Sequence, residues 1–206
     1  MRQLSCFTLP VVLAFSALPL TASAAPSYDC NKADGQVEQT ICQTPELQRL
    51  DNKLHEVYQA ALKQVSGEEK SLMKAFQRGW IKGRNDCWKS DKLGQCVEDN
   101  YKTRITELQI QAGKVTVPAP VTFQCKTQNL MVYFYNDTEV PVAVINELNP
   151  TTPDQQIYAF ISRSASGAKY EAQNLTFWTK GDEATLIRYG MPDETCRQMP
   201  QTSSSQ

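Results

Sequence analysis

Histidine is nearly absent from this chain of 206 residues, because His55 is the only one. One histidine cannot complete a zinc site of spaced ligands, and His55-Glu56 lacks the second histidine of a zinc-protease helix. The sequence also has no G-x-S-x-G motif and no phosphate-binding glycine loop. We therefore expect a protein that is not an enzyme and that carries neither a metal nor a cofactor.

A large charge of one sign is missing too. The formal net charge is -1, which does not suggest a nucleic-acid partner. The main apolar run, residues 7–20, is too short to span a bilayer. Met1-Arg2 precedes this run and Ala22-Ser23-Ala24 follows it, so we interpret residues 1–24 as a secretory signal peptide that is cleaved after Ala24.

The cysteines lack two common arrangements. None directly follows a Leu-small-small tripeptide, the site of lipid attachment in lipoproteins: Cys6 comes too early, and Cys30 follows Ser27-Tyr28-Asp29. We therefore expect a soluble mature protein without a stable membrane anchor. A Cys-x-x-Cys pair is missing as well. Six cysteines remain after cleavage, and in an oxidising compartment they are expected to form disulfides.

Residues 25–112 show the apolar spacing of helices. A long helix is expected from Thr44-Pro45, where proline takes the first helical position, to Ser66-Gly67. Further helices are expected at 34–42, around 72–87 and around 97–108. These elements predict a small helical bundle that two disulfides hold together. They would use Cys30, Cys42, Cys87 and Cys96, for which three pairings are open.

Beyond this bundle the pattern changes to that of strands. Residues 113–120 end in Pro118-Ala119-Pro120 and form an extended linker, and the polar tail 201–206 is expected to be disordered. Within 121–200 apolar and polar residues alternate in short runs separated by turn signals, at 121–126, 130–135, 140–144, 156–161, 169–172, 175–179 and 184–189. The fold class is thus α+β with two domains, the second a small antiparallel barrel or sandwich.

Cys125 and Cys196 lie at the first and last strands of this second domain. We expect them to pair, because the bond would close a long loop and stabilise the domain by about 4 kcal/mol. The sequence leaves the oligomeric state open.

The helical half resembles the LprI-type N-terminal domain. The pattern D-C-x(11)-C corresponds to Asp29-Cys30 and Cys42, W-x-x-x-R-x-x-C to Trp80, Arg84 and Cys87, and a second cysteine with a Tyr-Lys-x-Arg-Ile segment to Cys96 and 101–105. The family name comes from a lysozyme-inhibiting lipoprotein, and the role of the helical domain itself stays open.

The second half resembles the C-type lysozyme inhibitors of Gram-negative bacteria, the MliC/PliC family. Its two signature motifs, S-G-x-x-Y and W-x-K-G-D-E-A, correspond to Ser166–Tyr170 and Trp178–Ala184. The resemblance implies an eight-stranded antiparallel barrel, a periplasmic location and C-type lysozyme as the protein partner. Residues 121–200 carry nine acidic and six basic side chains, and this acidic excess would favour encounter with a cationic enzyme.

The resemblance also assigns roles to individual residues. Ser166 would donate a hydrogen bond to one catalytic carboxyl group of lysozyme, and Lys180 would pair with the other. Gly167 would let the loop approach closely, Tyr170 would support the loop or contact the rim, and Lys169 would add charge at the rim. Along the strand, Trp178 is interpreted as a core residue rather than a contact.

The leading hypothesis is a periplasmic inhibitor of C-type lysozyme that inserts the Ser166 loop and Lys180 into the catalytic cleft. The alternative is an envelope binding module that holds peptidoglycan fragments or another envelope protein without inhibiting lysozyme.

Overall fold

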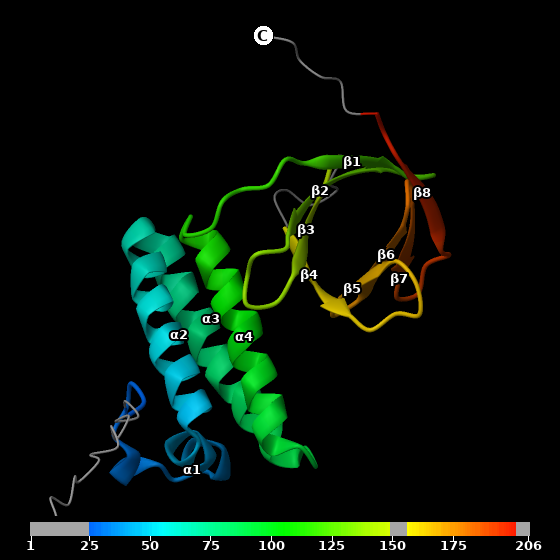
Figure 1. Cartoon of the computed structure of the whole chain (residues 1–206). Coiled ribbons are helices and arrows are strands. Elements are labelled where there is room, and N and C mark those ends of the chain that lie inside the picture. Colours follow the sequence, from blue (N-terminus) through cyan, green and yellow to red (C-terminus); the bar gives the residue numbers. More distant parts are fainter. Residues whose placement is uncertain (1–24, 149–155, 201–206) are drawn as a thin grey trace, which may run out of the picture.

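The computed structural model describes residues 25–148 and 156–200. Four α-helices come first, and a closed eight-stranded antiparallel barrel follows, as Figure 1 shows. The predicted fold class is therefore confirmed. The predicted signal peptide 1–24 and the tail 201–206 lie outside the described residues.

The helices begin and end close to the residues that the sequence predicts. They are α1 (Gln36–Gln43), α2 (Pro45–Gln64), α3 (Gly67–Asn85) and α4 (Leu93–Gln111). Pro45 opens α2, where a missing N–H costs nothing, and Thr44 before it is extended. Gly67 has a φ of 53°, so the glycine accommodates the turn between α2 and α3.

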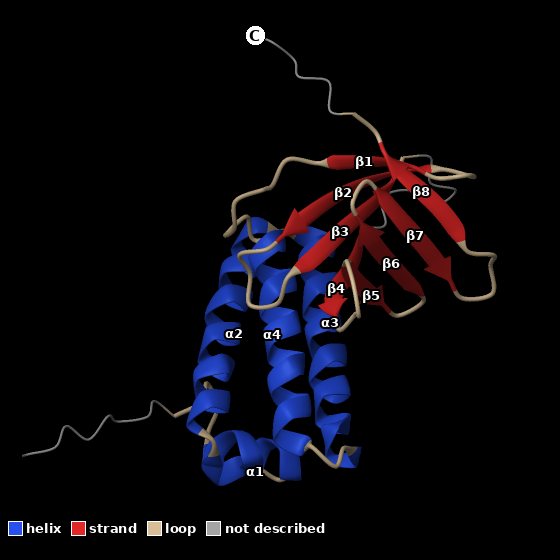
Figure 2. Cartoon of the chain, turned by 45° about the vertical axis from the view of Figure 1, so that its right-hand side comes forward, coloured by secondary structure: helices blue, strands red, loops and turns tan. Residues whose placement is uncertain are grey.

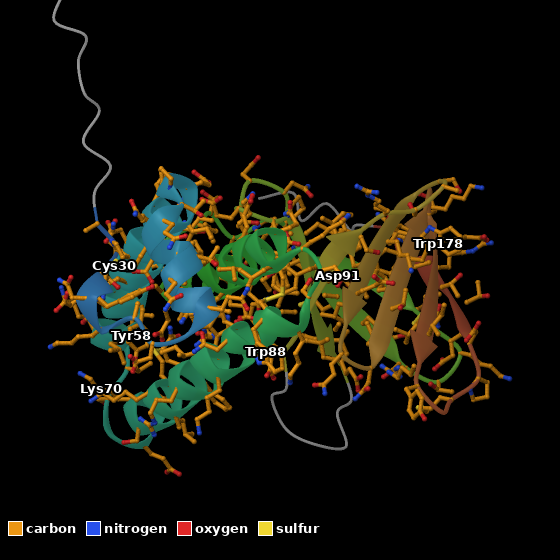
Figure 3. The ribbon with its side chains drawn as sticks, turned by 90° about the horizontal axis from the view of Figure 1, so that it is seen from below. Cys30, Tyr58, Lys70, Trp88, Asp91 and Trp178 are labelled. Atoms are coloured by element: carbon orange, nitrogen blue, oxygen red, sulfur yellow. A yellow bond between two sulfur atoms is a disulfide. The ribbon has the colours of Figure 1, made fainter. Side chains whose placement is uncertain are left out.

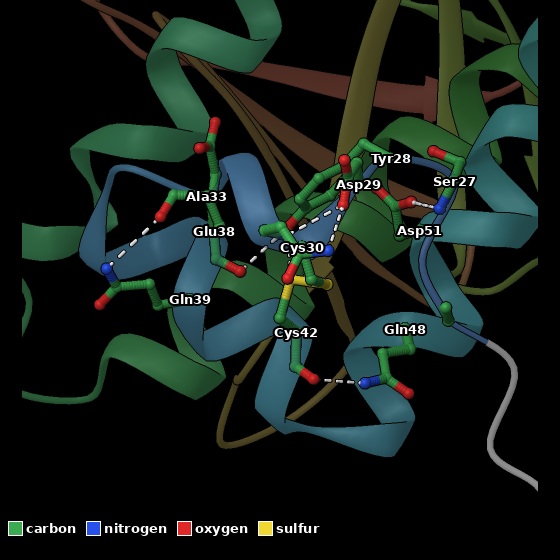
Figure 4. The surroundings of a disulfide bond; sticks show 12 residues. Ser27, Tyr28, Asp29, Cys30, Ala33, Glu38, Gln39, Cys42, Gln48 and Asp51 are labelled. Atoms are coloured by element: carbon green, nitrogen blue, oxygen red, sulfur yellow. Dashed lines mark hydrogen bonds between the residues drawn. A yellow bond between two sulfur atoms is a disulfide. The ribbon is translucent and has the colours of Figure 1, made fainter.

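The helical bundle is built on α1, α2 and α4, whose apolar faces share one core. Leu50, Val97, Tyr101 and Ile105 are fully buried there. By contrast, α3 lies beside this core and buries only two residues, Gln77 and Arg84 (Figure 2). Two disulfides hold the bundle together, Cys30–Cys42 (Figure 4) and Cys87–Cys96. The second one ties the short 3-10 helix after α3 to α4.

The barrel is a simple meander in which each strand pairs with the next and the last pairs with the first. Its strands are β1 (Val121–Gln124), β2 (Asn129–Tyr135), β3 (Val142–Glu147), β4 (Ile157–Ser162), β5 (Ala168–Ala172), β6 (Leu175–Lys180), β7 (Glu183–Arg188) and β8 (Glu194–Gln198). The rings of Phe123 and Phe177 pack edge to face in its interior, with 5.2 Å between the ring centroids. A third disulfide joins Cys125 to Cys196, the pair expected at the first and last strands.

The bundle packs against one side of the barrel. Strand β3 is buried on both faces, since Ala143 and Ile145 face the barrel core while Val142 and Val144 form a separate cluster next to Ile110 of α4. The backbone N–H of Val140 donates to Thr106 Oγ1 of α4 at 3.2 Å. An ion pair between Lys53 and Glu139 joins α2 to the β2–β3 loop. These contacts cover β3 and leave the β5–β6 hairpin uncovered (Figure 1).

None of the helices within the described part of the chain combines the length and the apolar character that crossing a membrane requires.

Candidate functional site

The two signature motifs meet at one end of the β5–β6 hairpin. Ala168 pairs with Thr179 and Lys169 pairs with Trp178, so Gly167 and Lys180 follow on the next rung. The segment that carries Ser166 therefore enters β5 where β6 ends in Lys180. Residues that are far apart in the two motifs become neighbours because antiparallel pairing brings the start of one strand to the end of the next.

Gly167 lies too close to the end of β6 for a side chain. Its φ is 70°, and a Cβ added there would lie 2.1 Å from the carbonyl oxygen of Thr179 and 3.3 Å from Lys180 Cβ. Only glycine fits both the left-handed conformation and the close approach. The contact holds the Ser166 turn directly against the end of β6.

We predict that Gly167→Ala destabilises the barrel by about 1 to 3 kcal/mol and weakens partner binding, because the strands must separate to accommodate the methyl group. Gly181→Ala is the matched control: Gly181 has a φ of 60°, but nothing lies within 4 Å of the added Cβ. Thermal unfolding of both variants measures the difference. Equal decreases in melting temperature for the two variants would contradict a steric role for Gly167.

Trp178 braces the same turn from the outer face of the barrel. Its Nε1 donates to the carbonyl oxygen of Ser166 at 2.8 Å, and the hydroxyl of Ser164 donates to the carbonyl of Gly167 at 2.9 Å. The prediction that Trp178 is a core residue is wrong, since 37% of it is exposed. The alternate residues Leu175 and Phe177 fill the interior instead. Figure 3 shows Trp178 on the side of the barrel away from the helical bundle.

Ser166 and Lys180 present free polar groups at this end. Both residues are exposed. Within the residues that the structure describes, neither the Ser166 hydroxyl nor the Lys180 ammonium has an ion pair or hydrogen bond. The backbone around both is fixed, while the two donors remain available for a partner. This combination of a held backbone and free donors is typical of a prepared binding surface.

Lys169 differs from Lys180 because its charge is already paired. Its ammonium forms an ion pair with Glu171 on the same strand. The hydrogen bond from Lys169, with a further one from Ser162, lowers the pKa of the Glu171 carboxyl. Lys169 therefore adds little net charge to the rim in the unbound protein.

Tyr170 supports the hairpin from within. Only 5% of this residue is exposed, and its ring lies 5.4 Å from the ring of Phe134. Burial raises the pKa of its hydroxyl group. Of the two roles expected for Tyr170, the structure favours support of the loop.

The sequence motifs do not identify two members of this arrangement, Ser164 and the backbone carbonyl of Thr179. Ser164 lies just before the motif, and its spacing of three residues to Gly167 is the available signal for a serine turn. The Thr179 carbonyl leaves no signal, because a backbone atom is the same in every residue. Its importance follows only from the register of β5 and β6.

Comparison with known proteins identifies two family segments. Residues 29–111 match the family model described as "Lysozyme inhibitor LprI". Residues 123–195 match the model described as "Membrane-bound lysozyme-inhibitor of c-type lysozyme" (MliC). Both resemblances noted from the sequence are thereby confirmed, and both descriptions are those of inhibitors rather than enzymes.

Among individual proteins, the chain is similar to the lipoprotein LprI of Mycobacterium tuberculosis and of Mycobacterium bovis. Each is 31% identical over 170 residues, which is 82% of this chain and 82% of the relative. A solved structure of Pseudomonas aeruginosa MliC in complex with hen egg white lysozyme is 26% identical. It covers 41% of this chain and 92% of that chain, with a TM-score of 0.29.

Proposed function

The chain belongs to the LprI family of lysozyme inhibitors, and from this premise we propose that it inhibits C-type lysozymes through the β5–β6 end of its barrel. One observation carries the proposal: the turn with the free hydroxyl of Ser166 enters β5 beside Lys180, the last residue of β6, whose ammonium is also free. The close approach of Gly167 to the Thr179 carbonyl holds this turn against the end of β6. The match of residues 123–195 to the C-type inhibitor model supports the choice of partner.

The chemistry of lysozyme explains why two donors are needed. The enzyme cleaves with two carboxyl groups, one a general acid and the other ionised, about 5 to 5.5 Å apart in retaining enzymes. The Ser166 hydroxyl would donate to the acid, and the Lys180 ammonium would pair with the ionised carboxylate. Insertion of both groups would exclude the substrate.

We propose further that the mature protein acts in the periplasm. Residues 25–112 would form the helical domain, 113–120 the linker and 121–200 the inhibitory barrel. The predicted secretory signal and the three disulfides of the described chain support an oxidising compartment outside the cytosol.

Titration of the mature chain against a C-type lysozyme tests the proposed function. We expect lysis of cell walls to fall to zero as the inhibitor approaches equimolar amounts, and the inhibition to be competitive with substrate. Undiminished lysis at a large excess of the chain would overturn the proposal. A goose-type lysozyme in parallel shows whether inhibition is selective for the C type.

A further inference from the structure

The helical bundle contains a cleft that the proposed inhibition does not use. It lies where α2, α3 and the N-terminal segment meet, and its volume is about 350 Å³, within the range of small-molecule sites. Its lining includes three aromatic rings, of Tyr28, Tyr58 and Trp80, and two amides, of Gln59 and Gln77. The cleft exists because α3 lies beside the core of the bundle rather than packing tightly into it.

Arg84 lies in the wall of this cleft, and some of its N–H groups have no hydrogen-bond acceptor in the part of the chain that the structure describes. It is 5% exposed and lies over the ring of Trp80 at 5.5 Å. Its Nε and Nη2 donate to Asn85 Oδ1 and its Nη1 donates to the Tyr101 hydroxyl, at 3.1, 2.8 and 2.8 Å. A guanidinium has five N–H groups, so these bonds leave donors unused. No carboxylate in the described residues forms an ion pair with Arg84.

Gln77 adds a second donor to the wall of the cleft. It is 8% exposed, and its Oε1 accepts from Arg104 Nε at 3.1 Å. Its amide N–H groups have no acceptor among the residues that the structure describes. These N–H groups are not enclosed, because Gln109 Oε1 is the only buried side-chain nitrogen or oxygen atom without a partner in the described residues. They open to the cleft, where a ligand can replace water as their acceptor. The walls of the cleft therefore favour a ligand rich in oxygen acceptors.

The carboxylates of the cleft restrict the charge of that ligand. Glu38 and Asp51 also line it, and Figure 4 shows both near the Cys30–Cys42 disulfide. Asp51 is satisfied, since it accepts from the Tyr101 hydroxyl at 2.7 Å and from the backbone N–H of Ser27 at 2.6 Å. Two carboxylates disfavour a simple anion, and the polar walls disfavour a purely apolar molecule.

We propose that this cleft binds a saccharide with acylamino groups, such as an N-acetylhexosamine unit. A sugar ring presents an apolar face to aromatic rings and hydroxyl groups to amides and carboxylates. The acylamino carbonyl is an acceptor for the spare N–H groups of Arg84 and Gln77. The helical bundle is then a glycan-binding module, a role distinct from lysozyme inhibition by the barrel.

The two sites lie on different parts of the molecule. Figure 3 shows Tyr58 within the bundle and Trp178 on the barrel, at opposite sides of the view. No residue that lines the cleft belongs to the barrel. Occupation of one site therefore leaves the other open, and each can be tested without the other.

Calorimetric titration of the mature chain with triacetylchitotriose, in the absence of lysozyme, tests the proposal. We expect saturable binding that Gln59→Ala weakens by about tenfold, through the loss of one hydrogen-bonding group. Gln64→Ala, an exposed glutamine on the same helix outside the cleft, serves as the control and should bind like the wild type. Lys180→Ala should also bind the sugar normally, even if the proposed inhibition fails.

Trp80→Phe keeps an apolar ring in the core and should weaken sugar binding while the melting temperature stays near the wild-type value. Absence of saturable binding at millimolar sugar would overturn the proposal. So would equal affinity of the wild type and Gln59→Ala. If Gln59→Ala instead weakens inhibition of lysozyme without any sugar binding, the cleft contacts a protein and the glycan assignment is wrong.

Discussion

Lys180→Ala is expected to weaken binding to a C-type lysozyme by about 2 to 5 kcal/mol, the range for removing one partner of a buried charge pair. The side chain is exposed in the free protein, so its truncation disturbs no internal contact. The whole effect of the substitution should therefore appear as a loss of binding free energy in the complex. Binding by calorimetry and inhibition of cell-wall lysis both report it.

The control for this variant is Lys63→Ala. Lys63 is an exposed lysine near the end of α2, in the bundle rather than the barrel. Its removal changes the net charge by the same amount and should alter binding by less than about 0.5 kcal/mol. If both variants weaken binding equally, Lys180 acts only through general charge and its assigned position in the catalytic cleft is wrong.

Replacing both Cys125 and Cys196 by alanine should destabilise the barrel by about 4 kcal/mol, since the bond closes a loop of 71 residues. The corresponding change at Cys87 and Cys96, which are separated by 9 residues, should cost about 2.5 kcal/mol in the bundle. Denaturant unfolding, followed separately for bundle and barrel by fluorescence and circular dichroism, compares the two. If removal of the Cys125–Cys196 bond lowers the free energy of unfolding by less than removal of the Cys87–Cys96 bond, the dependence of stabilisation on loop length is contradicted.

The helices could be predicted from sequence because their signals are local. Thr44-Pro45 and Ser66-Gly67 mark the ends of α2, and the structure places both ends within two residues of the prediction. Seven of the eight strands followed from alternation for the same reason, whereas no alternating run predicts β8 (Glu194–Gln198). By contrast, the partners of Cys30 and Cys87 could not be chosen, because three pairings satisfy the same count and only the packing of α1 and α4 selects one.

Trp178 shows where alternation fails. The period of two separates Leu175 and Phe177 from Trp178 but does not say which set faces the core. The size of the indole favours an interior position, whereas its N–H donates to the Ser166 carbonyl on the outer face. The cleft beside α3 could not be predicted from the sequence either. It arises from the spacing between helices, and Tyr28, Tyr58 and Trp80 come from three separate segments.

The roles of Ser166 and Lys180 toward the two carboxyl groups stay predictions, and a double-mutant cycle tests the role of Lys180 most directly. Binding is measured for wild type and Lys180→Ala against a C-type lysozyme and against the same enzyme with its catalytic aspartate changed to asparagine. We predict a coupling energy of at least about 1.5 kcal/mol between the lysine and that carboxylate. A coupling near zero, with both single changes weakening binding independently, would contradict the account.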